Sequence, residues 1–169
     1  MAKILDATVE LLREVGPEQL GVRAIAQRAG HNQRFVVEWF GSKVELFRRA
    51  YLQLIDEFVS VGQVLTRRSE PQPELVVIVR LMNWLVANDP DVFRDTAERP
   101  LLELVAAVYR QRFGIDDRTS ELLAQRLVAG LVSIILFGDL LRMTPEDLEQ
   151  QITLETRVAS LIAKHGLTD

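Results

Sequence analysis

The sequence predicts an all-α protein with a small N-terminal head, residues 1–47, and a helical body, residues 48–169, in about nine helices altogether. Three observations support this class. Apolar side chains recur every three or four positions along most of the chain, no segment shows the alternation of a strand, and Gly, Pro and capping residues interrupt the pattern at intervals. A length of 169 residues is enough for one domain, or for a head joined to a modest body.

The first two helices of the head are marked by their apolar spacing and by their stops. Residues 4–15 place apolar side chains at five of six positions on one helical face, and Gly16-Pro17 ends that helix. The same spacing continues over residues 22–29, and Gly30 ends the second helix.

The third and fourth helices follow within a few residues. Asn32 is expected to cap the third helix, whose inward pair is Val36 and Phe40. Ser42 and Glu45 have the spacing of a capping box, in which each side chain bonds the backbone of the other residue. They open a long fourth helix with an apolar stripe that extends to Val61 and Leu65.

The body begins after a linker-like stretch, residues 67–73, which holds two of the six prolines. Further helices are expected over residues 74–88, 91–98, 100–113 and 118–141. Thr144 precedes Pro145 and two acidic residues, which is the pattern of a capped helix start, and the last helix follows it.

Composition excludes several classes of protein. The chain contains no Cys, which excludes a disulfide scaffold, a Cys-ligated zinc site and a thiol nucleophile. Its two histidines have no partner at metal-ligand spacing and no Gly-rich phosphate loop appears, so we expect no enzyme, no metal and no cofactor. The charged residues near the N-terminus and the length of the longest uncharged run, short of the roughly 20 residues that span a bilayer, predict a soluble cytoplasmic protein that does not enter a membrane.

Charge is distributed unevenly along the chain. The whole protein has a formal net charge of -4, yet residues 19–50 hold six positive and two negative side chains. A basic segment on an acidic body is typical of a part that faces an anion.

Residues 22–40 have the outline of a helix-turn-helix, because two short amphipathic helices are joined by Gly30-His31-Asn32. With Val36 and Phe40 inward, the outward positions are 33, 34, 37 and 38. In DNA-binding versions of this motif the second helix enters the major groove, where Gln pairs with adenine and Arg with guanine. Spacing alone equally allows a plain helical hairpin with a solvated face.

The head resembles the DNA-binding region of the tetracycline-repressor (TetR) family of bacterial transcription regulators. The residues that carry the resemblance are Ile4-Leu5-Asp6-Ala7, Gly16, Val22-Arg23-x-Ile25-Ala26-x-x-Ala29-Gly30 and Trp39-Phe40-x-Ser42-Lys43-x-x-Leu46. The resemblance implies that Lys43, at a helix start, meets a DNA phosphate. The sequence departs from the family at Gly21, Phe35, Val37 and Glu38, where hydroxyl, aromatic or uncharged residues are usual.

The resemblance and the outward positions together define an expected DNA-contacting set: Arg23, Gln33, Arg34, Phe35, Val37, Glu38, Trp39 and Lys43. Two of these have alternative roles. Glu38 either pairs with Arg34 one turn earlier or accepts a hydrogen bond from cytosine. Trp39 either packs at the edge of the head or brings its indole N–H near a phosphate.

Residues 127–138 form a helical segment that is apolar on all sides, and such a helix must be buried all round. A partner subunit would cover it, and the family implies a dimer through the last two helices. A central core helix in a monomer is the alternative. The expected interface residues are Leu127, Gly130, Leu131, Ile134, Leu154, Val158 and Leu161.

The family also implies a small-molecule pocket in the body, where apolar walls with a few polar groups are expected. The candidate residues are Phe58, Arg80, Asn83, Trp84, Phe93 and Tyr109, each of which could instead be ordinary core or surface. We therefore expect a dimeric repressor that binds a palindromic operator in double-stranded DNA and is released by an effector. The alternative is an all-α small-molecule-binding or interaction protein whose head has lost DNA binding.

Overall fold

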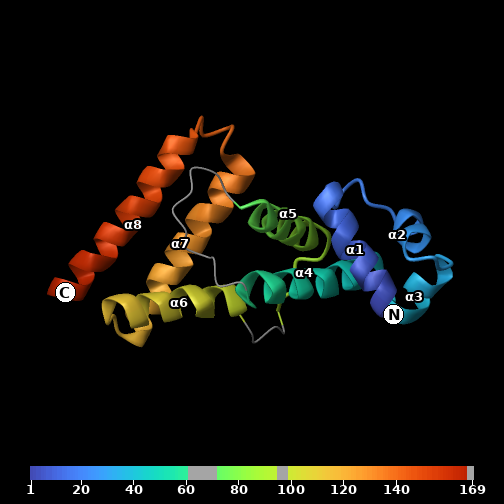
Figure 1. Ribbon diagram of the computed structural model, residues 1–169, viewed down its shortest axis with the longest axis horizontal. Coiled ribbons are helices and arrows are strands. Elements are labelled where there is room, and N and C mark those ends of the chain that lie inside the picture. The colour runs from blue at the N-terminus through green and yellow to red at the C-terminus, as the bar shows by residue number, and fades with distance from the viewer. Residues whose placement is uncertain (61–71, 95–98, 167–169) are drawn as a thin grey trace. The chain divides into compact units, whose positions relative to one another are not determined.

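The computed structural model describes residues 1–60, 72–94 and 99–166, and its secondary structure there is helical, without strands (Figure 1). This confirms the predicted all-α class. The eight helices of these residues are α1 (Ala2–Glu14), α2 (Val22–Arg28), α3 (Arg34–Phe40), α4 (Lys43–Ser60), α5 (Pro73–Asn88), α6 (Pro100–Phe113), α7 (Asp117–Phe137) and α8 (Pro145–His165).

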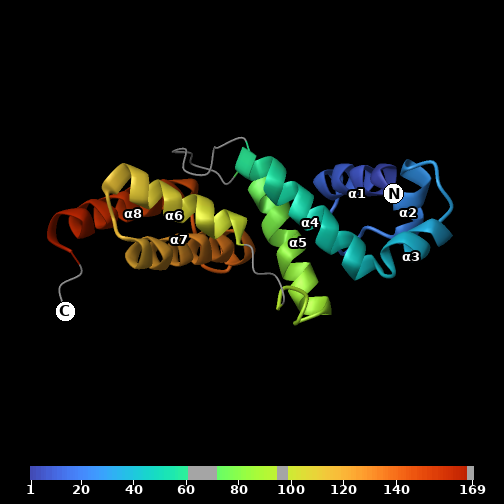
Figure 2. The same ribbon diagram turned by 90° about the horizontal axis from the view of Figure 1, so that it is seen from below.

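Contacts divide the chain into two compact units. The first holds α1 to α5, and its core forms where α1, α3 and α5 pack on α4 and α2 packs on α1 (Figure 2). The fully buried side chains include Ile4, Ile25, Phe47 and Leu81, which the helical spacing of each segment places on one face. Thr8 is also buried, and its hydroxyl donates to the Ile4 carbonyl at 2.7 Å, so no polar group is left unpaired there.

The turn between α2 and α3 depends on Gly30. The His31 N–H donates to the Ala26 carbonyl at 2.9 Å and the Gly30 N–H to the Gln27 carbonyl at 3.1 Å, which is the Schellman arrangement at a helix end. Gly30 has φ +68°, a left-handed conformation in which a side chain is strained. This residue therefore sets where α2 ends and where α3 can begin.

Two caps were predicted beside α3. The N-cap of α3 is Gln33, one residue after the predicted Asn32, and the capping box at Ser42 forms only in part. Asn32 Oδ1 accepts the Arg34 backbone N–H at 3.0 Å, at the start of α3. Ser42 Oγ accepts the Glu45 N–H at 3.0 Å, but the Glu45 carboxylate does not return to Ser42. It pairs instead with Arg48 at 2.7 Å and Arg49 at 2.9 Å, because two guanidinium groups within one turn offer charged donors.

The second unit holds α6, α7 and α8. α6 packs along α7, and α8 runs antiparallel to α7 after the turn at residues 138–144 (Figure 1). Its core cluster includes Val105, Tyr109, Leu123, Leu127 and Ala159. The predicted start of the last helix is confirmed, since the Thr144 hydroxyl accepts the Asp147 N–H while the Asp147 carboxylate accepts the Thr144 N–H.

Some expected boundaries differ from the structure. A helix was expected over residues 91–98, but residues 90–94 form turns. The backbone N–H groups of Val92 and Arg94 donate to the carbonyls three residues earlier, those of Asp89 and Asp91, which is the hydrogen bond of a turn. α7 ends at Phe137, four residues earlier than expected, and turns follow it. Residues 95–98, Val61 and Leu65 of the expected fourth-helix stripe, and residues 67–71 of the expected linker lie outside the described residues.

The predicted boundary between residues 47 and 48 separates an expected DNA-binding part from an expected ligand-binding part. It does not coincide with the boundary between the two compact units. The first unit continues through α4 and α5 because both helices pack on the head. The boundary between a DNA-binding part and a ligand-binding part stays a prediction.

Gly30→Ala should lower the free energy of unfolding by about 1–2 kcal/mol, since an added Cβ meets no atom within 4 Å and only the left-handed backbone is strained. Gly30→Asn should cost less, because Asn tolerates this conformation. Urea denaturation of the three proteins measures both values. Equal losses for Ala and Asn would contradict the assignment of the cost to backbone conformation.

Candidate nucleic-acid interface

The outward face of α3 carries the residues predicted to read bases. Gln33, Arg34, Val37 and Glu38 are exposed, and Val36 and Phe40 are buried in the core of the first unit, as the spacing predicted. α3 follows α2 through a short turn, so α2 and α3 form a helix-turn-helix. The face that the second helix of this motif offers to a groove is therefore free of contacts with the rest of the unit.

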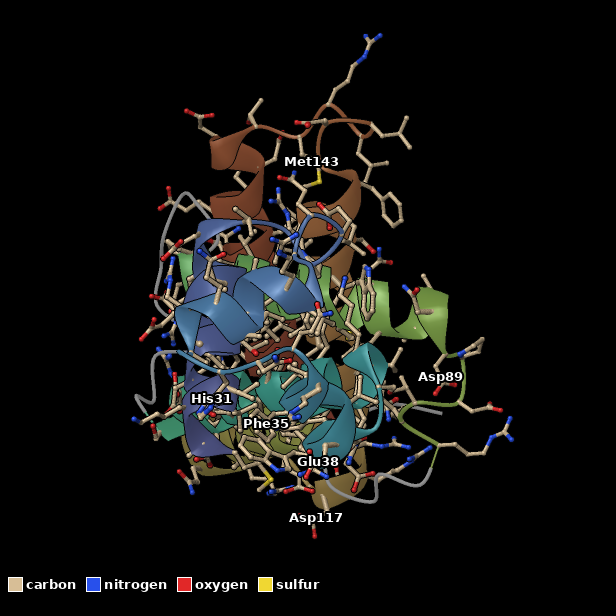
Figure 3. All side chains as sticks on the ribbon, turned by 90° about the vertical axis from the view of Figure 1, so that its right-hand side faces the viewer. His31, Phe35, Glu38, Asp89, Asp117 and Met143 are labelled. Carbon is tan, nitrogen blue, oxygen red and sulfur yellow. The ribbon has the colours of Figure 1, made fainter. Side chains whose placement is uncertain are left out.

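An aromatic cluster occupies a neighbouring face of α3. The rings of Phe35 and Trp39 stack with centroids 4.9 Å apart, and His31 meets them edge-on at 5.9 and 5.5 Å. Figure 3 shows His31 close to Phe35, and Glu38 lies on α3 with Phe35. The cluster was not predicted, although aromatic side chains at positions 31, 35 and 39 have the four-residue spacing of one helical stripe.

Ion pairs neutralise much of the positive charge of the head. Arg28 makes a two-bond contact with Glu14, at 2.9 Å for each bond, and that hydrogen bond lowers the pKa of the Glu14 carboxyl. Arg13 pairs with Glu57 at 2.6 Å. Within the part of the chain that the structure describes, Arg23 and Arg34 make no ion pair and remain available to an anion.

An ion pair with Arg34 was one of the two roles expected for Glu38. The structure shows no such pair between these two described side chains. The Arg34 guanidinium lies over the Phe35 ring, 4.9 Å from its centroid, where the negative face of the ring attracts it. The Glu38 carboxylate consequently has no described cationic partner and stays exposed beside Val37.

Lys43, expected at a phosphate, is turned toward the interior of the first unit. Its ammonium donates to the Pro17 carbonyl at 3.2 Å and lies 4.8 Å from the centroid of the Phe47 ring and 4.7 Å from that of Trp84. The two rings are themselves 4.8 Å apart. Burial lowers the pKa of Lys43, and the charge of Glu18 opposes that shift. A phosphate contact by Lys43 stays a prediction, and it would require the ammonium to leave this position.

The residues predicted to bind a ligand are spread over both units. In the first unit Phe58 is buried, Arg80 and Asn83 are exposed, and Trp84 contacts Phe47 and Lys43. Phe93 lies 5.0 Å from the ring of Tyr51, whose pKa burial raises to about 12. Tyr109 belongs to the core of the second unit. Their role as ligand contacts stays a prediction.

The second unit contains a cavity of about 450 Å³. Its wall includes Tyr109, Phe113, Leu127 and Ile152, with Glu155 among them. One Glu155 oxygen pairs with Arg126 at 3.1 Å, and the other is buried without a hydrogen-bond partner in the described part. Arg112, Arg157, Thr153 and Thr156 complete the wall, so apolar and polar side chains share it.

The residues predicted to form a dimer interface divide into buried and exposed groups. Leu127 lies in the core of its own unit, and Leu131 and Val158 pack against that core, while Gly130 and Ile134 are half-buried. Leu154 and Leu161 are 53% and 59% exposed on α8. The exposed members offer the most apolar surface to another molecule, and the half-buried ones on α7 add to it.

α7 is long and apolar enough to cross a bilayer, judged by length and composition alone. Only 22% of its most apolar window is buried within the chain. The core helices of soluble proteins meet the same criterion, so this helix does not by itself indicate a membrane protein. It does show that much of an apolar helix remains uncovered.

A helix-turn-helix with an exposed second helix is the arrangement with which helical DNA-binding regulators enter the major groove. Residues 4–50 match the family described as bacterial regulatory proteins, tetR family. No curated protein shows a significant sequence match to the chain.

Solved structures of regulators share the fold over nearly the whole chain. A transcriptional regulator from Rhodococcus sp. Rha1 is 20% identical with a TM-score of 0.63, and the match covers 99% of this chain and 98% of that one. The TetR family repressor AlkX from Dietzia sp. strain DQ12-45-1b, implicated in biodegradation of n-alkanes, is 19% identical with a TM-score of 0.51, over 96% and 92%. A tetR-family transcriptional regulator from Streptomyces coelicolor is 15% identical with a TM-score of 0.52, over 96% and 80%.

The resemblance found in the sequence is thereby confirmed: the chain carries the TetR-family N-terminal region on the fold of TetR-family transcriptional regulators. Regulators of this family are generally non-enzymatic cytoplasmic proteins that bind DNA and small-molecule ligands and usually form dimers.

Lys43→Met keeps the apolar stem and removes the ammonium, so it should lower the free energy of unfolding by about 1 kcal/mol. Trp84→Leu should also destabilise the protein, and the double variant should lose less than the sum of the two losses, because both changes remove the same contact. Chemical denaturation of the four proteins measures the coupling. Lys3→Met, at an exposed position on α1, is the control, and strictly additive losses would show that the ammonium and the ring do not interact.

Proposed function

We propose that the chain is a homodimeric cytoplasmic repressor that binds a palindromic DNA operator and is released by a small-molecule effector. The observation that carries the DNA-binding part is the outward face of α3, where Gln33 and Arg34 are exposed and Arg34 has no ion-pair partner in the described part. Gln and Arg are the side chains that make two-bond contacts with adenine and guanine in the major groove.

Arg23 and Arg34 are suited to different contacts. Arg34 begins the second helix of the motif, whose first residues meet base edges. Arg23 lies in the first turn of α2, the helix that crosses the backbone in this geometry. We assign base reading to Arg34 and a phosphate contact to Arg23.

Arg34→Ala should weaken binding to the best selected operator by about 1–3 kcal/mol and relax the preference at one base position. Arg23→Ala should weaken binding to all DNA sequences alike. It should also lower the slope of log K against log salt concentration by about one unit. Titrations of labelled operators at several salt concentrations measure both effects. Arg99→Ala, which removes the same charge from an exposed position of the second unit, is the control.

Two results would change the assignment. If the Arg23 and Arg34 variants behave identically, the placement of α3 in the groove is wrong although the protein binds DNA. If the wild type selects no sequence at all, the alternative function holds, a helical ligand-binding protein without DNA binding. The departures from the family at Gly21, Val37 and Glu38, and the inward position of Lys43, are the features that favour that alternative.

The dimer is proposed through α7 and α8. Large apolar side chains that are exposed in this part of the chain are Leu122, Phe137, Leu140, Leu141, Leu154 and Leu161. Leu154 and Leu161 are two turns apart and lie on one stripe of α8 with the half-buried Val158 between them. A surface of this kind is what a second copy would cover, and two-fold pairing is the commonest assembly of such chains.

Replacing both Leu154 and Leu161 with Glu should convert the dimer to a monomer at micromolar concentration, because burying unpaired carboxylates at an interface costs several kcal/mol. Sedimentation velocity measures the change. Val86→Glu puts a charge on an exposed apolar position of α5 in the first unit and should leave the dimer intact. A wild-type protein that sediments as a monomer would refute the proposal.

Effector release is supported by the family and by the cavity of the second unit. The volume of about 450 Å³ suits a small molecule, and its mixed wall of aromatic, aliphatic and charged side chains favours a compound with both an apolar part and polar groups. The buried Glu155 oxygen could accept a hydrogen bond from such a compound. For release to occur, the effector must bind the DNA-free state better than the DNA-bound state.

A further inference from the structure

Val37 is an apolar side chain in the place where a base-reading residue belongs. It is 61% exposed on the second turn of α3. The other apolar residues of this helix are accounted for, since Val36 and Phe40 are buried in the core and Phe35 stacks on Trp39. Val37 is thus the large, mostly exposed apolar side chain of α3 on the face proposed to meet DNA.

Its neighbours on that face are polar. Gln33 lies one turn earlier on the same stripe, Arg34 lies three residues earlier, and Glu38 follows directly. The Val37 side chain excludes water from a small area of this face. It can pair with no hydrogen-bond donor or acceptor of a base. It favours whichever base edge has an apolar group at that point.

Only one base offers such a group in the major groove. Guanine, cytosine and adenine present donors and acceptors there, whereas thymine adds its C5-methyl group to one acceptor. A methyl group against a valine is buried without leaving a polar atom unpaired. Cytosine at the same position would place its N4 amino group near Val37, with Glu38 as its one possible acceptor.

We infer that Val37 selects thymine in each operator half-site by contact with the thymine methyl group. The position lies one or two base pairs from the base read by Arg34, because three residues of helix rise about 4.5 Å and successive base pairs are about 3.4 Å apart. The inference rests on the proposed DNA binding and adds to it the identity of one base and of the residue that reads it.

Deoxyuridine tests this contact, since it lacks only the methyl group of thymidine and keeps its base pairing. The full-length wild type first selects its best operator from random DNA. Each thymine of that operator is then replaced by deoxyuridine symmetrically in both half-sites, and fluorescence anisotropy measures Kd at constant salt. One position should lose affinity by about fourfold for each half-site, the value expected for one buried methyl group.

Val37→Ala should weaken binding to the thymine operator by a similar factor and should no longer distinguish deoxyuridine from thymidine at that position. Val37→Thr keeps one methyl group of the side chain and should retain part of the distinction. Val86→Ala, at an exposed valine of α5, should behave as the wild type. The loss of methyl discrimination in the Val37 variant alone is the expected result.

Any of three results would overturn the inference while leaving DNA binding established. One is a wild type that binds every deoxyuridine operator as tightly as the thymidine operator. Another is a Val37→Ala protein with the same deoxyuridine loss as the wild type, which would assign the methyl contact to a different residue. A selected cytosine at this position that depends on Glu38 would equally refute it. Failure of the wild type to select any sequence would instead refute the proposed function itself.

Discussion

The buried face of α4 is the constraint on which the first unit depends. Phe47, Ala50 and Leu54 lie at three- or four-residue intervals, Leu46 precedes Phe47 directly, and all four are almost completely buried. α1, α3 and α5 all pack on this helix, so its start fixes the position of α3 through the Gly41 turn. A helix with one buried apolar stripe has one way to face its neighbours, and the outward residues of α3 are exposed as a consequence.

Ion pairs within the head determine which arginine side chains remain available to an anionic partner. Glu14 holds Arg28 and Glu45 holds Arg48 and Arg49, so a count of positive residues overstates what the surface offers. These carboxylates have lowered pKa values because guanidinium hydrogen bonds favour their charged form. The resulting pairs orient α1 against α2 and order the first turns of α4. Arg23 and Arg34 keep their charge available.

The inward position of Lys43 connects the start of α4 to α5. The ammonium is held by one carbonyl and two rings, which together replace part of its hydration. The contact joins the end of the head to Trp84, a residue of the helix that the sequence associated with ligand binding. Any rearrangement that moves Trp84 therefore alters the surroundings of Lys43 and of the turn that follows α3.

The sequence by itself determined the helices, most of their ends, and the inward and outward sides of α3. Apolar periodicity and caps such as Thr144 are local, so they can be read without knowing the fold. Tertiary structure alone decided the partners of Lys43, because packing brings the Pro17 carbonyl and the Trp84 ring beside its ammonium. Arg34 and Glu45 meet residues within four positions along the chain, so their choice among near neighbours is a local one. The family resemblance implied a phosphate contact for Lys43, which stays a prediction, and spacing suggested a complete capping box at Ser42 and, as one of two alternatives, an ion pair between Arg34 and Glu38. In the folded chain Lys43 and Arg34 lie over aromatic rings and Glu45 pairs with arginines.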